Sequence, residues 1–308
     1  MINRTVEGAI QLESEYSLNI TALSHAGILS KLPRSGTFGV VGIDGREYPA
    51  PTLGQVAELF SRNKELVGRK VSQGFDRLEL TPLALPMSFF IDRMEKVIIE
   101  HAAAGKIYQT KRTPSASLIP VRVNAEKHVW IWETLKQALD ADELIYFPQE
   151  YSNYHQGQTK LGVVDNERIC AVPGWSVELV ENLPIMPQFG EGLILGGRKQ
   201  LEVGFSPREY LQVLQTPFYR GETGKTLEDF ITSFLIRLET ANEVSNDVDD
   251  SNALWCLGQY LKISYAEVVP TGRWVRKVGR VRLDMHRTGN KLCTKDWGGS
   301  TVVRLPRP

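Results

Sequence analysis

Cysteine is scarce in this chain of 308 residues, and no two cysteines form a CxxC pair. The three that occur are Cys170, Cys256 and Cys293. They are too few and too widely spaced for the disulfide framework of a small secreted domain or for a zinc knuckle. We therefore expect reduced thiols and a cytosolic environment.

Long apolar runs and net charge are also missing. The first residues lack the apolar segment of a secretory signal, and no later stretch approaches the roughly 18 apolar residues of a membrane helix. The 36 basic residues are balanced by 36 acidic ones. The sequence thus predicts a cytoplasmic protein without a membrane partner, in which any electrostatic partner is recognised by a local patch rather than by overall charge.

Motifs of catalysis and of metal binding are absent or incomplete. The glycine and lysine before Thr226 suggest a phosphate loop, but Tyr219 stands where a Walker A motif needs its first glycine, so helix capping is the better interpretation. Residues 246–252 have aspartates at the one-three spacing of a calcium loop. However, Asn252 and Gly258 occupy the places of the required glycine and glutamate, which favours a solvated acidic loop over an irregular calcium site.

The titratable and nucleophilic residues form no recognisable catalytic pattern either. No serine occurs in GxSxG, and the histidines follow no HExxH or paired spacing; they are His25, His101, His128, His155 and His286. Cys170 with His155 is a conceivable nucleophile and base, against the alternative of a buried and inert thiol. We predict that the protein is not an enzyme and uses no cofactor.

The first third of the chain predicts a small α/β region. Thr52 and Gln55 form a capping box for a helix that continues to Leu66, and Ser88 caps a second helix that Gly105 ends. Residues 111–120 are rich in proline, serine and threonine and are the best linker. We accordingly predict an N-terminal region over residues 1–115 and a second domain over residues 116–308.

The second domain alternates short strands with two helices. Strands are predicted over residues 143–147 and 175–180, and helices follow the capping residues Ser206 and Thr226. The second helix carries an apolar stripe typical of a core-facing helix, at Leu227, Phe230, Ile231, Phe234, Leu235 and Leu238. After residue 254 the chain alternates apolar and polar residues as strands do. The fold class is therefore α+β.

The C-terminal tail concentrates positive charge. Between Arg273 and Arg304 there are nine basic residues and two tryptophans, opposed only by Asp284 and Asp296. Such a segment can present cations on one face of a sheet to phosphates, nucleic-acid bases or acidic proteins. In the alternative interpretation the arginine stems cover a half-buried sheet and are neutralised within the fold by Glu239, Glu243, Asp247, Asp249 and Asp250.

The order of several short motifs resembles the variable proteins of diversity-generating retroelements that end in a C-type-lectin-like domain, similar to that of formylglycine-generating enzymes. The similarity runs from about Ile43 to the end of the chain. Its motifs are LIYFP at 144–148, HQGQTK at 155–160, GWSV at 174–177, GGRKQLE at 196–202, SPREYL at 206–211, LGQY at 257–260, WVR at 274–276 and VVR at 302–304.

The resemblance implies a rigid fold that displays exchangeable residues for binding diverse ligands. The scaffold positions would be Trp274, Arg276, Leu283, Val303 and Arg304. The ligand-binding positions would be Thr271, Arg273, Val275, Lys277, Arg282, Asp284, His286, Lys291, Lys295 and Trp297. The excess of arginine and lysine over the tyrosine, serine and asparagine of usual binding loops indicates an acidic macromolecular ligand, such as a protein.

Two other functions are open at this point. The same cations could bind the phosphates of a nucleic acid, in which case affinity would fall steeply with salt. An enzyme with the formylglycine-generating fold would need a cysteine pair near a groove, for which Cys256 and Cys293 are the candidates.

Overall fold

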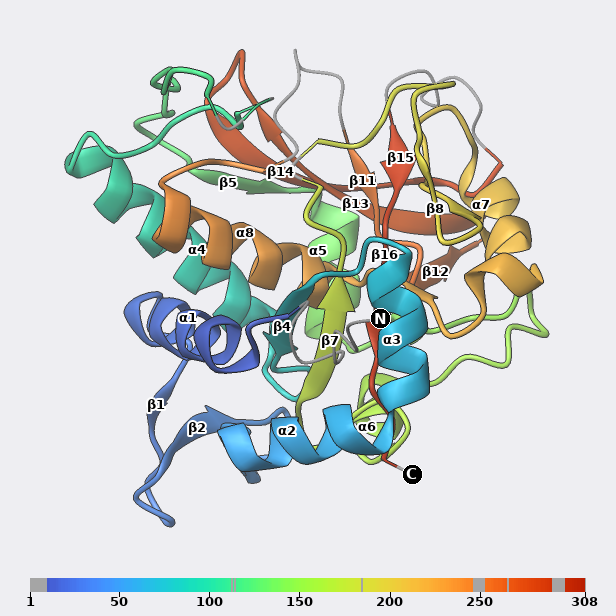
Figure 1. Cartoon of the computed structure of the whole chain (residues 1–308). Helices are drawn as coiled ribbons and strands as arrows, with labels where there is room; N and C mark the ends of the chain where they lie inside the picture. The colour runs from blue at the N-terminus through green and yellow to red at the C-terminus, as the bar shows by residue number, and fades with distance from the viewer. Residues whose placement is uncertain are drawn as a thin grey trace.

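The computed structural model describes residues 10–307 except for residues 112, 114, 184, 246–252, 265 and 290–296. Helices and several small sheets give an α+β fold, as predicted (Figure 1). The helices are α1 (Leu12–His25), α2 (Leu53–Arg62), α3 (Lys64–Ser72), α4 (Met87–Ala103), α5 (Glu133–Asp140), α6 (Lys160–Val164), α7 (Pro207–Leu214), the 3₁₀ helix η2 (Pro217–Tyr219) and α8 (Leu227–Ala241).

The strands form four sheets. They are β1 (Ser30–Lys31), β2 (Phe38–Val41), β3 (Glu47–Pro49), β4 (Arg77–Thr81), β5 (Val129–Ile131), β6 (Ile145–Tyr146), β7 (Ser176–Val180), β8 (Ile194–Leu195), β9 (Arg198–Lys199), β10 (Thr223–Gly224), β11 (Leu254–Trp255), β12 (Gln259–Ile263), β13 (Ala266–Val275), β14 (Arg280–Arg287), β15 (Gly298–Gly299) and β16 (Thr301–Arg304).

The central sheet has the order β10-β16-β7-β4, and its neighbouring strands are antiparallel. β4 is an edge strand, and α1 covers its edge. The buried Asn19 of α1 donates to the carbonyl of Leu78 at 2.8 Å and accepts from the backbone N–H of Leu80 at 3.0 Å. One amide side chain therefore completes the backbone pairing that an edge strand otherwise leaves open.

The predicted boundary near residue 115 does not separate two hydrophobic cores. β4 precedes it, yet β4 pairs along its whole length with β7, which follows it. α1 and α4 also lie beside α8 (Figure 1), and Leu23 and Phe90 belong to the same buried cluster as Leu235 and Val303. The correction has a physical reason: a loop rich in proline marks a turn of the chain, but non-local strand pairing decides which segments share a core.

Helix starts follow the predicted capping boxes more closely than helix ends do. Thr52, Ser206 and Thr226 each cap a helix as expected. The helix expected to reach Leu66 instead breaks at Asn63, whose side-chain amide donates to the carbonyls of Leu59 and Pro306. The second predicted helix begins at Met87, one residue before Ser88. In the region 116–307, α5 and α6 accompany the two predicted helices, α7 and α8.

A row of charged side chains crosses the central sheet beneath α8, and we call it the interior row. Glu79 on β4 lies opposite Glu178 on β7, and Glu178 lies opposite Arg304 on β16. Arg304 binds Glu178 and also Asp229 of α8, at 2.6 Å between Nη2 and Oδ2. All four side chains are at most 8% exposed. The row therefore joins three strands to the helix through buried charges.

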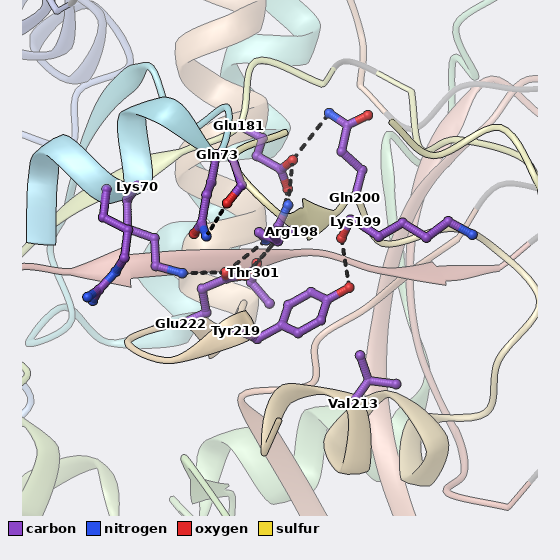
Figure 2. A network of polar contacts seen from close by, with 12 residues as sticks. Lys70, Gln73, Glu181, Arg198, Lys199, Gln200, Val213, Tyr219, Glu222 and Thr301 are labelled. Carbon is purple, nitrogen blue, oxygen red and sulfur yellow. Dashed lines mark hydrogen bonds and ion pairs between the residues drawn. The ribbon is translucent and has the colours of Figure 1, made fainter. Parts of the chain in front are cut away.

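A second buried network surrounds Arg198 at the start of β9, and Figure 2 shows it from close by. The guanidinium donates to Glu181 at 3.0 Å and to Glu222 at 2.8 Å. Lys70 of α3 contacts Glu222 at 2.6 Å, and the Thr301 hydroxyl donates to the same carboxylate at 2.7 Å. Two cations match two carboxylates, so the network is internally neutral and ties α3 and β9 to the central sheet.

Candidate ligand-binding surface

The candidate surface is built on the long antiparallel pair of β13 and β14. Thr271 lies opposite Asp284, and Arg273 lies opposite Arg282. Because residues directly opposite one another share a face and side chains alternate along each strand, one face of the pair collects six of the predicted ligand-binding residues. We call it the outward face; its members are Thr271, Arg273, Val275, Arg282, Asp284 and His286.

The other face of the same two strands packs into the core. Trp274 is 1% exposed and stacks on Phe234 of α8, with 6.5 Å between ring centroids. Leu283 is fully buried, and its partner Gly272 leaves room for Phe230, which a Cβ atom at that position would approach to 2.5 Å. The sequence had assigned Trp274 and Leu283 to the scaffold, and their burial agrees with that assignment.

Two guanidinium groups on the outward face lie over tryptophan rings. The guanidinium carbon of Arg273 is 5.1 Å from the centroid of Trp297, and that of Arg282 is 4.5 Å from the centroid of Trp130. Arg282 also pairs with Asp284 at 2.6 Å. Stacking and pairing hold these cations in defined positions without removing them from solvent: the Arg282 side chain is 40% exposed.

Asp284 is the negative centre of this face. Burial acts to raise the pKa of its carboxyl group, but His286, Arg282 and the backbone N–H of Met285 together hold the pKa below its ordinary value. Asp284 is therefore ionised at neutral pH. His286 in turn meets the ring of Trp297 edge-on, with 4.5 Å between centroids, so the carboxylate, the imidazole and the aromatic rings form one connected array.

The structure divides the predicted ligand-binding residues into two groups. Thr271 is 2% exposed and Asp284 and Trp297 are each 7% exposed, contrary to the expectation that they face a ligand. Asp284 and Trp297 belong to the array of rings and charges, and Thr271 lies between Asp284 and Trp255 in the sheet. The accessible members are Arg273, Val275, Lys277, Arg282 and His286. Lys291 and Lys295 lie outside the described residues.

Two of the acidic residues expected to neutralise the tail have other partners. Glu243 pairs with Arg237, and Glu239 lies beside His25 and His101. Neither is paired with the tail in the described part of the chain, and the aspartates at 247, 249 and 250 lie outside it. Within the described residues, Arg304 pairs with Glu178 and Asp229 of the interior row, and Arg282 pairs with Asp284. Arg304 thus has the buried role expected of a scaffold residue.

One contributor to the outward face could not be found from the tail alone. Trp130 belongs to β5, which pairs in parallel with β14 and places Trp130 opposite Arg282. The local sequence around Trp130 gives only a short apolar segment. The signal that would have placed it is the pairing of two strands far apart in the chain, which a single sequence does not reveal.

The two cysteines among the described residues, Cys170 and Cys256, are buried and unreactive. Burial raises the pKa of Cys170 to about 12 and that of Cys256 well above its ordinary value, so both are protonated at neutral pH. Cys293, the proposed partner of Cys256, lies outside the described residues. No contact joins Cys170 to His155 among the interactions of the described residues.

Comparison with family models, curated proteins and solved structures finds no match to this chain. In the described part of the chain, no helix has both the length and the apolar character required to cross a membrane. The assignment of function therefore depends on the geometry of the chain itself.

Proposed function

We propose that the protein is a non-catalytic binding protein that presents the outward face of β13 and β14 to a macromolecular ligand, in the manner of the variable proteins of diversity-generating retroelements. One observation supports this most: beside the turn between the two strands, the partly exposed Arg273, Val275, Arg280 and Arg282 alternate with the buried Trp274, Val281 and Leu283. Exchange of the accessible residues changes what the surface binds, whereas the framework residues keep the backbone in place. The proposal includes a C-type-lectin-like architecture for the C-terminal part of the chain.

The chemistry of the accessible residues points to an acidic ligand. Arg273, Lys277 and Arg282 are cationic and at least partly exposed, and Arg282 pairs with the buried Asp284. Guanidinium groups that are already positioned over aromatic rings lose little conformational entropy when they bind a carboxylate. An acidic protein surface is the partner that we propose.

A matched pair of libraries tests the display function directly. One library exchanges Arg273, Val275, Lys277 and Arg282, and the other exchanges Trp274, Val281, Leu283 and Met285. We expect most members of the first library to remain folded, judged by cooperative thermal unfolding, and most members of the second to be lost. Equal losses in the two libraries would contradict the proposal, because the accessible residues would then be part of the framework.

The genomic context tests the link to retroelements. Sequencing around the gene should reveal a reverse transcriptase and a near-copy of the 3′ end that differs mainly at adenines. Finding neither removes the retroelement part of the proposal and leaves only the binding surface.

Nucleic-acid binding is the second candidate, because the exposed cations can contact phosphates. One tryptophan disfavours it for single strands: Trp297 is 7% exposed beneath Arg273, so its ring is not open for stacking on a base. Titration with single- and double-stranded oligonucleotides over a range of salt concentrations separates the candidates. Tight binding that weakens steeply with salt would favour nucleic acid over an acidic protein.

A further inference from the structure

A cavity of about 190 Å³ lies between α8 and the β4–β7 side of the central sheet, and it plays no part in the outward face. Most of its wall is apolar, including Leu78, Met186, Leu201, Phe230 and Ile236. The rest of the wall is polar and includes Arg77, Glu181 and Arg237, together with three side chains that contact one another: Glu79, Lys225 and Ser233. The cavity is thus amphipathic.

The three polar side chains are joined in a row by hydrogen bonds, and we call this row the relay. The Ser233 hydroxyl donates to the carboxylate of Glu79, with oxygen–oxygen distances of 2.7 and 2.9 Å, and accepts from the ammonium group of Lys225 at 2.8 Å. Glu79 and Lys225 are each 8% exposed. Ser233 comes from the middle of α8, Glu79 from the edge strand β4, and Lys225 from the residue just before the α8 N-cap.

The relay leaves bonding capacity unused at both ends. An ammonium group has three N–H donors, yet Ser233 is the hydrogen-bond partner of Lys225 among the described residues. A carboxylate has about four acceptor sites, and Glu79 receives one hydroxyl proton. Two further polar atoms of residues that line the cavity, Ser245 Oγ and Arg237 Nε, are buried without a partner in the described part of the chain. A buried polar group without a hydrogen-bond partner lowers the stability of the fold unless a molecule in the cavity provides that partner.

We propose that this cavity binds a small apolar α-amino acid, with its ammonium group on Glu79, its carboxylate on Lys225 and its side chain against the apolar wall. Both charged ends of the relay then gain the partner that they lack, and the apolar wall is covered. Burial raises the pKa of Glu79, and a ligand ammonium group beside it offsets that effect. The cavity volume is below the roughly 300–1,000 Å³ of sites for drug-sized molecules, which agrees with a ligand of this size.

Calorimetric titration of the full chain with L-leucine, L-methionine and L-phenylalanine tests the proposal. We expect saturable binding of at least one of them. Two analogues of leucine then test each charged end separately: N-acetyl-L-leucine lacks the ammonium group, and L-leucinamide lacks the carboxylate. Each should bind about tenfold more weakly or worse, because each leaves one buried charge without its partner.

Variants locate the site. Glu79→Gln and Lys225→Met should each weaken binding by about tenfold or more, since both remove a charged partner of the ligand. Matched exposed controls, Glu58→Gln and Lys262→Met, should bind as the natural chain does. If Lys225→Met fails to fold, Glu79→Gln, which keeps the side-chain shape, and the leucine analogues still decide the question.

Three outcomes would overturn the proposal. One is that none of the apolar amino acids binds the natural chain. Another is that leucine and its two analogues bind equally well, which would show that the charged groups of the ligand are not recognised. The last is that leucine binds but Glu79→Gln and Lys225→Met leave its affinity unchanged, which would place the amino acid elsewhere on the protein.

Discussion

The interior row and the outward face contain the same kinds of charge in opposite surroundings. In the interior row, burial raises the pKa of Glu178 although Arg304 acts to lower it. On the outward face, burial again acts to raise the pKa of Asp284, but the neighbouring cations prevail and the pKa is lowered. Both carboxylates have an arginine partner, so proximity to a cation does not explain the difference.

The balance of charge and water explains it. In the interior row, Glu79, Glu178 and Asp229 share Arg304 and, near one end, Lys225. Three carboxylates thus face two cations away from solvent, and an uncompensated charge there is costly. Among the described residues of the outward face, Asp284 faces Arg282 and His286 at the edge of solvent. We therefore expect the interior row to contribute more to the stability of the fold than the accessible side chains of the outward face do.

Among the substitutions proposed, removal of Arg304 should have the largest effect on the stability of the protein. Arg304→Met leaves Glu178 and Asp229 buried without their cation, so we expect the free energy of unfolding to fall by about 3–5 kcal/mol. Urea denaturation at neutral pH measures it. Arg307→Met is the control, because Arg307 pairs with Glu167 at the surface and its loss should cost at most about 1 kcal/mol. Equal effects of the two substitutions would show that the interior row contributes no more to stability than a surface ion pair does.

Truncation of a buried side chain of β14 should have the second-largest effect on stability. Leu283 is fully buried, so Leu283→Ala should lower the free energy of unfolding by about 2–5 kcal/mol through lost burial and an unfilled cavity. The same denaturation experiment applies. A loss below about 1 kcal/mol would mean that the two faces of β14 do not differ as described.

The response to pH should have opposite signs in the two arrays. The pKa of Glu79 is raised above its ordinary 4.5, so the folded state favours the protonated form, and this contribution to stability is lost as pH rises above that value. The pKa of Asp284 is lowered below its ordinary 3.8, so its contribution is present above that value and is lost as pH falls.

Urea denaturation at a series of pH values measures both contributions. The stability of the natural chain relative to Glu79→Gln should decrease as pH is raised above 4.5. Relative to Asp284→Asn it should increase as pH is raised through the acidic range. If both stability differences changed with pH in the same direction, the assigned causes would be wrong. Those causes are burial as the dominant influence on the pKa of Glu79, and neighbouring cations as the dominant influence on the pKa of Asp284.

The smallest effect is expected from the cation that the outward face displays. Arg282 is 40% exposed at its side chain, and its contacts are a ring and one carboxylate. We expect Arg282→Ala to lower the free energy of unfolding by no more than about 1 kcal/mol. A loss as large as that of Leu283→Ala would remove the distinction between display and framework residues.

Local chemistry in the sequence predicted the parts of the fold that short segments determine. The capping boxes at Ser206 and Thr226 predicted the starts of α7 and α8, and the apolar stripe of α8 is buried. The alternation in the tail predicted strands, and the structure has β13, β14 and β16 there. Each of these patterns depends on neighbours a few positions away, which is why a single sequence reveals them.

What the sequence did not reveal depends on contacts between distant segments. The pairing of β4 with β7 joins the two predicted domains, and the parallel pairing of β5 with β14 brings Trp130 beneath Arg282. The cavity with Glu79, Ser233 and Lys225 is likewise assembled from separate elements. Glu79 in a short strand and Ser233 in an apolar helix give no local signal of function, because their meeting follows from tertiary packing alone.

The position of Trp130 has a consequence for how such a surface could evolve. Its codon lies far upstream of the codons for β13 and β14, so a process that rewrites only the 3′ end of the gene would leave this ring untouched. Every variant of the gene would then keep Trp130 beside the exchanged residues of β13 and β14. The ring would favour arginine at the neighbouring position, and the set of ligands bound by the variants would be biased towards acidic ones.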